Sequence, residues 1–175
     1  MGRQKDMINY ALIVFMTVAF SGSIAFADVL KGDLDEDGFR EHITFIKRPA
    51  KEDSIFHCIE GTIHITSKAK TCSIKIGTIE FSDMASMGLI RMSNKKLFIG
   101  IFAFGGVHSE WLYLYSFDGS RIKEEARIFS DAPSIEIKDI NHDGVKEILA
   151  KHRDYEKNPI INSYIKIYKF PEKRE

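Results

Sequence analysis

Two acidic segments with the same residue pattern constrain this chain more than any other feature. Each has Asp at position 1, Asp or Asn at position 3, Asp at position 5, Gly at position 6 and Glu at position 9. One segment runs from Asp33 to Glu41 and the other from Asp139 to Glu147. Oxygen-bearing side chains at alternate positions, followed by a glycine that permits a sharp bend, are typical of loops that bind a hard divalent cation. The sequence therefore predicts Ca²⁺ as the cofactor.

The predicted ligands are the side chains at positions 1, 3, 5 and 9 and the backbone carbonyl at position 7. In the first loop these residues are Asp33, Asp35, Asp37, Phe39 and Glu41. In the second loop they are Asp139, Asn141, Asp143, Val145 and Glu147. The first loop has four carboxylates, whereas the second has three and a neutral amide, so we expect the first to bind more tightly. The alternative is that both segments are ordinary exposed turns, in which acidic residues and glycine are also common.

The spacing does not match an EF-hand. An EF-hand loop has a bidentate Glu at position 12 and a helix on each side. Position 12 is Thr44 in the first loop and Ala150 in the second. The residues that follow, 43–46 and 148–150, have the composition of strand starts. We therefore expect each loop to lead into a β-strand.

The rest of the chain has the short periodic runs that β-strands produce. Residues 61–66 and 72–76 alternate apolar and polar side chains, as half-buried strands do. Residues 111–117 are apolar on both faces, which predicts a central strand. The Asp-Gly pair at 118–119 is a hairpin signal, with 121–128 as the returning strand. Helical periodicity is weak after the N-terminal segment, so we expect an all-β fold.

One combination of strands recurs along the chain. The aromatic run at 111–117 aligns with 164–170, and the preceding segment, 88–100, aligns with 135–150 when the acidic loop is shortened. A unit of strand, loop, strand, longer loop and aromatic strand therefore occurs twice, and a divergent first copy is expected to begin at Asp33. Repeats of this length are typical of propeller blades with about four strands each. The alternative is a chance self-alignment of a strand-rich chain.

The second acidic loop and its flanking strands, residues 135–149, resemble the FG-GAP/VCBS repeat of integrin-type β-propellers, and residues 32–38 fit the same pattern. The hairpin at 113–119 also resembles outer strands of such repeats in small secreted bacterial proteins. The resemblance implies blades in which a Ca²⁺ loop joins two strands. However, the middle copy lacks the acidic loop, and three units are too few to close a propeller. A partial propeller, a compact β-sandwich of the same units, and closure by self-association as a homo-oligomer remain open.

The N-terminus has the pattern of an export signal. Two basic residues precede an apolar run at residues 8–20, and an Ala-x-Ala cleavage site follows at 25–27. We therefore expect a signal peptide over residues 1–27 and one all-β domain over residues 28–175, located in the periplasm or outside the cell. After signal removal, no membrane span is expected. The alternative is an uncleaved anchor, although the apolar run is short for a span.

Charge and motifs argue against several classes of function. Without Arg3, Lys5 and Asp6, the totals of 25 basic and 25 acidic residues become 23 and 24. This balance argues against a nucleic-acid partner. The sequence has no nucleotide-binding Gly-rich loop, nucleophile elbow or His-Glu-x-x-His zinc motif. Paired carboxylates occur only within the predicted metal loops, where a cation would keep them ionised. We therefore expect a protein that is not an enzyme.

The chain has two cysteines, Cys58 and Cys72, which flank two predicted short strands and a polar turn. Because exported proteins meet an oxidising environment, a disulfide between them is expected, and it would staple a hairpin. The alternative is two buried free thiols. No catalytic role is expected for either cysteine, because no neighbouring residue in the sequence would activate the thiol.

Residues 105–111 form the candidate recognition loop. Two glycines free the backbone, and His108, Glu110 and Trp111 place polar groups beside an aromatic ring. Loops of this composition often bind a protein or a glycan. A plain connection into a core strand is the alternative.

Together these features predict an exported calcium-binding β-repeat protein. We expect it to act as a non-catalytic binding module for a protein or glycan of the cell envelope or medium. The alternative is a periplasmic inhibitor of a cell-wall hydrolase, similar to lysozyme inhibitors, whose loop around His108 would plug the cleft of the enzyme. A metal-dependent hydrolase would require an open coordination position beside the acidic loops.

Overall fold

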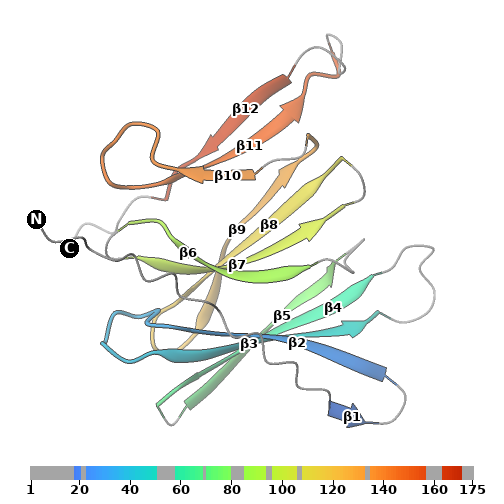
Figure 1. Ribbon diagram of the computed structural model, residues 1–175, viewed down its shortest axis with the longest axis vertical. Coiled ribbons are helices and arrows are strands. Elements are labelled where there is room, and N and C mark those ends of the chain that lie inside the picture. The colour runs from blue at the N-terminus through green and yellow to red at the C-terminus, as the bar shows by residue number, and fades with distance from the viewer. Residues whose placement is uncertain are drawn as a thin grey trace, which may run out of the picture.

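The computed structural model describes residues 18–20, 23–50, 58–68, 70–79, 85–93, 96–105, 108–132, 135–156 and 163–170. In these ranges the chain forms twelve β-strands and no helix (Figure 1). The predicted all-β fold is therefore confirmed. None of the described segments is an apolar helix of the length that a bilayer crossing requires.

The strands form three antiparallel sheets. The first contains β1 (Val18–Phe20), β2 (Ser23–Gly32), β3 (Glu41–Pro49), β4 (Ile59–Ser67) and β5 (Lys70–Ile79). The second contains β6 (Ser86–Arg91), β7 (Leu97–Phe104), β8 (Glu110–Phe117) and β9 (Ile122–Ser130). The third contains β10 (Ile135–Lys138), β11 (Glu147–Arg153) and β12 (Ser163–Tyr168). Consecutive strands are hydrogen-bonded neighbours in every sheet, so each sheet is a meander.

The second sheet lies between the first and the third (Figure 1). Ile99 and Tyr115 belong to the core that it forms with the first sheet, whereas Phe98 and Leu114 belong to the core with the third. Because successive side chains of a strand point to opposite faces, β7 and β8 need apolar residues at almost every position. The predicted central place of residues 111–117 is confirmed, since β8 pairs with β7 on one side and β9 on the other.

The repeated unit that the sequence predicts corresponds to these meanders. The aromatic runs at 111–117 and 164–170 fall largely on β8 and β12, each the third strand of its sheet. The acidic loops join the first two strands of the repeated unit, from β2 to β3 and from β10 to β11. In the second sheet a shorter connection, residues 92–96, occupies this place. Three blade-like meanders are therefore present, but the first begins in β2 and not at Asp33, because the loop needs a strand before it.

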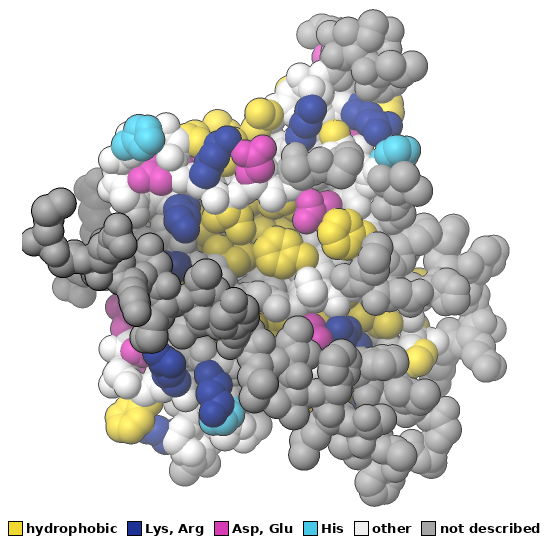
Figure 2. Space-filling view, viewed as in Figure 1, with side chains coloured by type: hydrophobic (Ala, Val, Ile, Leu, Met, Phe, Trp, Pro, Cys, Tyr) yellow, Lys and Arg dark blue, Asp and Glu magenta, His cyan; other side chains and the backbone are white. Residues whose placement is uncertain are grey.

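The three meanders form an open stack. The first and third sheets lie at its two ends (Figure 1). Ile165 and Ile167 on β12 are 57% and 46% exposed, so no other sheet among the described residues covers them. Part of the core between the second and third sheets also reaches the surface, and Figure 2 shows hydrophobic side chains in the middle of this face. The arrangement is that of a partial propeller.

The expected signal peptide lies largely outside the described residues, and export stays a prediction. The described part of residues 1–27 consists of β1 and the start of β2. In this region Phe26 pairs with Lys47 and Ala27 pairs with Ile46. Cleavage after Ala27 would leave the rest of β2, from Asp28 onward, paired with β3.

The predicted disulfide between Cys58 and Cys72 is wrong, because both residues are free thiols. The hairpin itself is present as β4 and β5, and Lys68 lies in the turn that follows β4. The strand register places Cys72 opposite Ile65, seven residues along the chain from Cys58. At about 3.3 Å per residue, this offset corresponds to roughly 23 Å. A disulfide needs Cα atoms within about 7 Å of each other.

Candidate metal centre

The last residue of each acidic loop fixes the two ends of the loop together. Glu41 and Glu147 begin β3 and β11, and they are only 0% and 3% exposed. The Leu34 N–H donates to Glu41 Oε2 at 2.8 Å, and the Ile140 N–H donates to Glu147 Oε2 at 3.1 Å. Each buried carboxylate therefore accepts a hydrogen bond from the second residue of its own loop, which brings the entering and leaving strands together.

The two loops share one backbone conformation, although they lie in different sheets. The glycines at position 6, Gly38 and Gly144, have φ angles of 86° and 85°. Only glycine adopts this region without strain, which explains its place in both segments. At position 4, Glu36 and His142 also have positive φ angles, of 64° and 62°. Because non-glycine residues seldom adopt this conformation, its occurrence at the same position in both loops supports their equivalence.

Two types of hydrogen bond recur in both loops, although Asp139 Oδ1 also accepts from the Asp143 N–H at 3.2 Å, whereas Asp33 Oδ1 has no partner. The carboxylate at position 1 accepts from the glycine N–H, and the carboxylate at position 5 accepts from the N–H two residues later. The first type joins Gly38 N to Asp33 Oδ2 at 3.1 Å and Gly144 N to Asp139 Oδ2 at 2.9 Å. The second joins Phe39 N to Asp37 Oδ1 at 2.9 Å and Val145 N to Asp143 Oδ1 at 2.8 Å. The matching sequence pattern thus produces matching loops.

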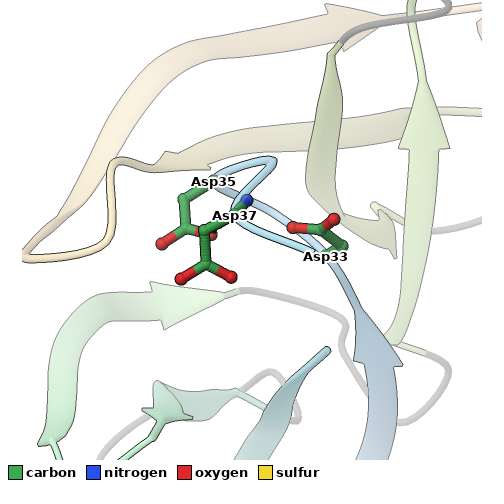
Figure 3. Close-up of side chains that lie close together, drawn as sticks. All are labelled: Asp33, Asp35 and Asp37. Atoms are coloured by element: carbon green, nitrogen blue, oxygen red, sulfur yellow. Dashed lines mark hydrogen bonds between the residues drawn. The ribbon is translucent and has the colours of Figure 1, made fainter. Parts of the chain in front are cut away.

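The first loop brings three carboxylates into one group. Asp33, Asp35 and Asp37 each have an oxygen within 4.8 Å of the others (Figure 3). Asp33 Oδ1 is buried and has no hydrogen-bond partner. A buried carboxylate oxygen without a partner is costly, and a bound cation would satisfy it. Clustered carboxylate oxygens are also the donors that hard cations such as Ca²⁺ prefer. The residues present therefore fit a divalent cation.

Other predicted ligands are placed differently. Glu41 is not part of this group, and its second oxygen, Oε1, accepts a hydrogen bond from Ser67 Oγ at 3.0 Å. In the second loop, the amide Nδ2 of Asn141 donates to Asp143 Oδ2 at 2.8 Å. Among the described residues, no second group of three acidic, histidine or cysteine ligands comes equally close. The structure thus gathers three carboxylates in the first loop, and the remaining predicted ligands stay predictions.

A lysine from another hairpin contacts the first loop. Lys68, in the turn between β4 and β5, places Nζ 2.6 Å from Asp37 Oδ2 and 4.6 Å from the ring centroid of Phe39. The hydrogen bond from Lys68, together with the Phe39 N–H, holds the pKa of the Asp37 carboxyl below its usual value. Sequence reasoning missed Lys68, because it lies 31 residues after Asp37 in a segment without a recognisable motif.

The first loop also contacts the second sheet. A Cβ atom at Gly119, in the hairpin between β8 and β9, would lie 2.7 Å from Asp35 Oδ2. Gly119 has a φ angle of 83°, which glycine adopts without strain, although the connection runs from residue 118 to residue 121 and is longer than the predicted two-residue turn. Next to it, the Cys72 thiol donates to the Ser120 carbonyl at 2.9 Å. The glycine therefore serves two purposes, since it makes the turn and leaves room for the carboxylate.

The predicted recognition residues do not form one exposed face. His108 is exposed, but Trp111 is half-buried in β8. Glu110 Oε2 accepts a hydrogen bond from the Ile135 N–H at 2.8 Å and so connects the second and third sheets. The Ser109 hydroxyl donates to the Gly105 carbonyl, which closes the connection between β7 and β8. Of the three predicted residues, Glu110 has a clear structural role.

A row of rings that the sequence does not reveal starts at Trp111 and crosses to the third sheet. The centroids of Trp111 and Phe129 are 4.6 Å apart, and those of Phe129 and His152 are 6.3 Å apart. His152 stacks on Tyr164 at 5.2 Å with an interplanar angle of 20°. Tyr164 is 54% exposed. The four residues come from β8, β9, β11 and β12, so only the folded chain brings them together.

The chain was compared with known proteins in three ways. No family model, no curated protein and no solved structure matches it. The resemblance of the acidic loops to FG-GAP/VCBS repeats therefore stays a prediction, and function has to be inferred from the geometry of the site.

Proposed function

We propose that this chain is an exported calcium-binding β-repeat protein that acts as a non-catalytic binding module. One observation carries the metal part of the proposal. Asp33 Oδ1 is buried without a partner inside a group of three carboxylates from one loop. The loop shares its positive φ angles at positions 4 and 6, and the hydrogen bond from the glycine N–H to the position 1 carboxylate, with the second acidic segment, which supports a common purpose for the two.

The role of the cation in this proposal is structural. Asp33, Asp35 and Asp37 would hold it, with the Phe39 carbonyl as a further oxygen donor. A bound cation neutralises the repulsion between three neighbouring carboxylates. The loop joins β2 to β3 and lies against the hairpin between β8 and β9. Ordering this loop would therefore stabilise the contact between the first two blades.

The binding part of the proposal is supported by the row of rings from Trp111 to Tyr164. Aromatic side chains with partly exposed faces are the common anchors of protein and glycan interfaces. The row continues across two sheets, which gives it the length of an extended ligand. We expect its partner to be a protein or glycan of the cell envelope or medium.

Thermal unfolding in CaCl₂ and in excess chelator tests the metal site. At a Ca²⁺ concentration ten times Kd, binding stabilises the folded state by about 1.4 kcal/mol. For a chain of this size, that corresponds to a rise in Tm of about 3–6 °C. Asp33→Asn keeps an acceptor for the Gly38 N–H but removes the charge, so it should lose the part of this rise that the first loop contributes. Glu136→Gln, at an exposed carboxylate on β10, is the matched control and should keep it.

Equal Tm values of the unsubstituted protein in CaCl₂ and in chelator would contradict the proposed metal site.

Affinity capture from envelope extracts and culture medium, with and without Ca²⁺, would identify the partner. A partner captured equally well by a variant without the Tyr164 ring would contradict the proposed surface.

A further inference from the structure

We propose that Lys68 is a built-in counter-ion of the first loop that competes with Ca²⁺ for Asp37. The first loop would then bind Ca²⁺ more weakly than its four carboxylates predict. This inference rests on the proposed function, because it concerns the affinity of the same site. It also adds a factor that the expectation from the sequence leaves out, because that expectation compares only the number of carboxylates in the two loops.

Two contacts hold Lys68 at the loop. Its ammonium lies 2.6 Å from Asp37 Oδ2 and 4.6 Å from the centroid of the Phe39 ring. Both partners belong to the predicted metal loop, at positions 5 and 7. The backbone of Lys68 has a φ angle of 50°, which non-glycine residues seldom adopt. The turn between β4 and β5 therefore presents this side chain to the loop.

In the second loop, the equivalent carboxylate oxygen at position 5 accepts its hydrogen bond from an amide and not from a lysine. Its position 5 oxygen, Asp143 Oδ2, accepts a hydrogen bond from the neutral amide of Asn141 at 2.8 Å. A lysine beyond β12, Lys169, lies 3.8 Å from Glu147 Oε1, and 66% of its side chain is exposed. Equivalent oxygens of two equivalent loops thus have a full positive charge in one case and an amide in the other.

The competition follows from charge. A divalent cation among Asp33, Asp35 and Asp37 would take up the Asp37 carboxylate and repel an ammonium at hydrogen-bond distance from it. Lys68 would have to leave Asp37, and because 56% of its side chain is exposed, water is available to solvate it. In the absence of Ca²⁺, the same ammonium offsets part of the repulsion among the carboxylates. Lys68 therefore stabilises the metal-free loop and destabilises the metal-bound loop.

Calorimetric titration with CaCl₂ tests this role. All variants should carry Asp143→Asn, which weakens Ca²⁺ binding by the second loop but keeps an acceptor for the Val145 N–H. The chain with this substitution alone is the parent. Lys68→Met removes the charge and keeps an unbranched side chain. From the worth of an exposed ion pair and the repulsion of a divalent ion, we expect its Kd to be roughly threefold to tenfold lower. In chelator, its Tm should fall below that of the parent.

Two controls separate charge from other effects. Lys68→Arg keeps the positive charge, and Lys70→Met removes a charge from the other side of the same turn. Both should leave Kd within about twofold of the parent. In Lys68→Arg a guanidinium still faces Asp37, and in Lys70→Met the Lys68 ammonium is unchanged. If the parent binds Ca²⁺ and Lys68→Met has the same Kd, the inference is wrong while the proposed function stands. If no variant binds Ca²⁺, both are wrong.

Discussion

Replacing Glu41 by Leu tests whether the last residue of the first loop is a structural brace, that is, a residue that stabilises the fold by holding the two ends of the loop together. Glu41 is fully buried, and each of its two oxygens accepts a hydrogen bond. The donors are the Leu34 N–H at 2.8 Å and the Ser67 hydroxyl at 3.0 Å. Leu34 is 5% exposed and Ser67 is 8% exposed, so water does not easily replace the lost acceptor.

The expected loss in the free energy of unfolding follows from these two donors. A buried donor without a partner costs about 1–3 kcal/mol. The serine hydroxyl can rotate toward another acceptor, whereas the backbone N–H of Leu34 cannot. We therefore expect Glu41→Leu to lower the free energy of unfolding by about 2–4 kcal/mol in chelator, with the larger part from the N–H. Glu147→Leu, which removes an acceptor from the Ile140 N–H, should cost about 1–3 kcal/mol.

Urea unfolding in chelator measures both values, with the slope m compared to show that the unfolded states are alike. Glu41→Gln distinguishes a structural role of the Glu41 side chain from a role as a Ca²⁺ ligand. Its carbonyl oxygen can still accept from Leu34, so a brace would lose little stability, whereas a ligand would lose Ca²⁺ affinity. A loss below about 0.5 kcal/mol for Glu41→Leu, the range of ordinary surface substitutions, would refute the brace.

Three further predictions concern packing, recognition and pH. A Cβ atom at Gly100 would lie 2.4 Å from Ile90 Cδ1, so Gly100→Ala should cost about 1–2 kcal/mol in urea unfolding. At Gly88, directly opposite, the nearest atom is 3.6 Å away and Gly88→Ala should be tolerated. Tyr164→Ala should reduce capture of the partner severalfold with little change in Tm, whereas Tyr164→Phe should retain capture. The Val145 N–H and the Asn141 amide lower the pKa of Asp143. Its contribution to stability is therefore present above 3.8, the ordinary aspartate value, and is lost as the pH falls through the lower folded pKa. The stability difference between the parent and Asp143→Asn should shrink in acid, and a difference that grows in acid would contradict this assignment.

The parts of the structure that local rules govern could be predicted from the sequence. The Asp-Gly pair at 118–119 indicates the hairpin between β8 and β9, where Gly119 has the positive φ angle that glycine adopts without strain. The strand at 111–117 is apolar on both faces because it lies between two cores. The two acidic segments predict two similar loops, because position 6 needs glycine and the alternate carboxylates accept nearby N–H groups.

The disulfide prediction that failed, and the contacts that the sequence did not indicate, depend on register or on residues far apart in the chain. The Cys58–Cys72 disulfide required the two cysteines to lie opposite each other in the hairpin, but the register places Cys72 opposite Ile65, seven residues along the chain from Cys58. The burial of Glu41 against Ser67 depends on how β3 pairs with β4. The position of Lys68 depends on the same pairing, and the loop's contact with Gly119 on how the first sheet packs against the second.

Local patterns in the sequence indicate several of the strands, the Asp-Gly turn and the likeness of the two acidic loops, since each depends on residues only a few positions apart. Only the tertiary structure decided which groups surround those loops. Lys68 and Ser67 reach the first loop through strand pairing, and the ring row from Trp111 to Tyr164 assembles across two sheets. Charge compensation and surface shape act through space, so residues that are remote in the sequence surround loops whose own pattern the sequence alone displays.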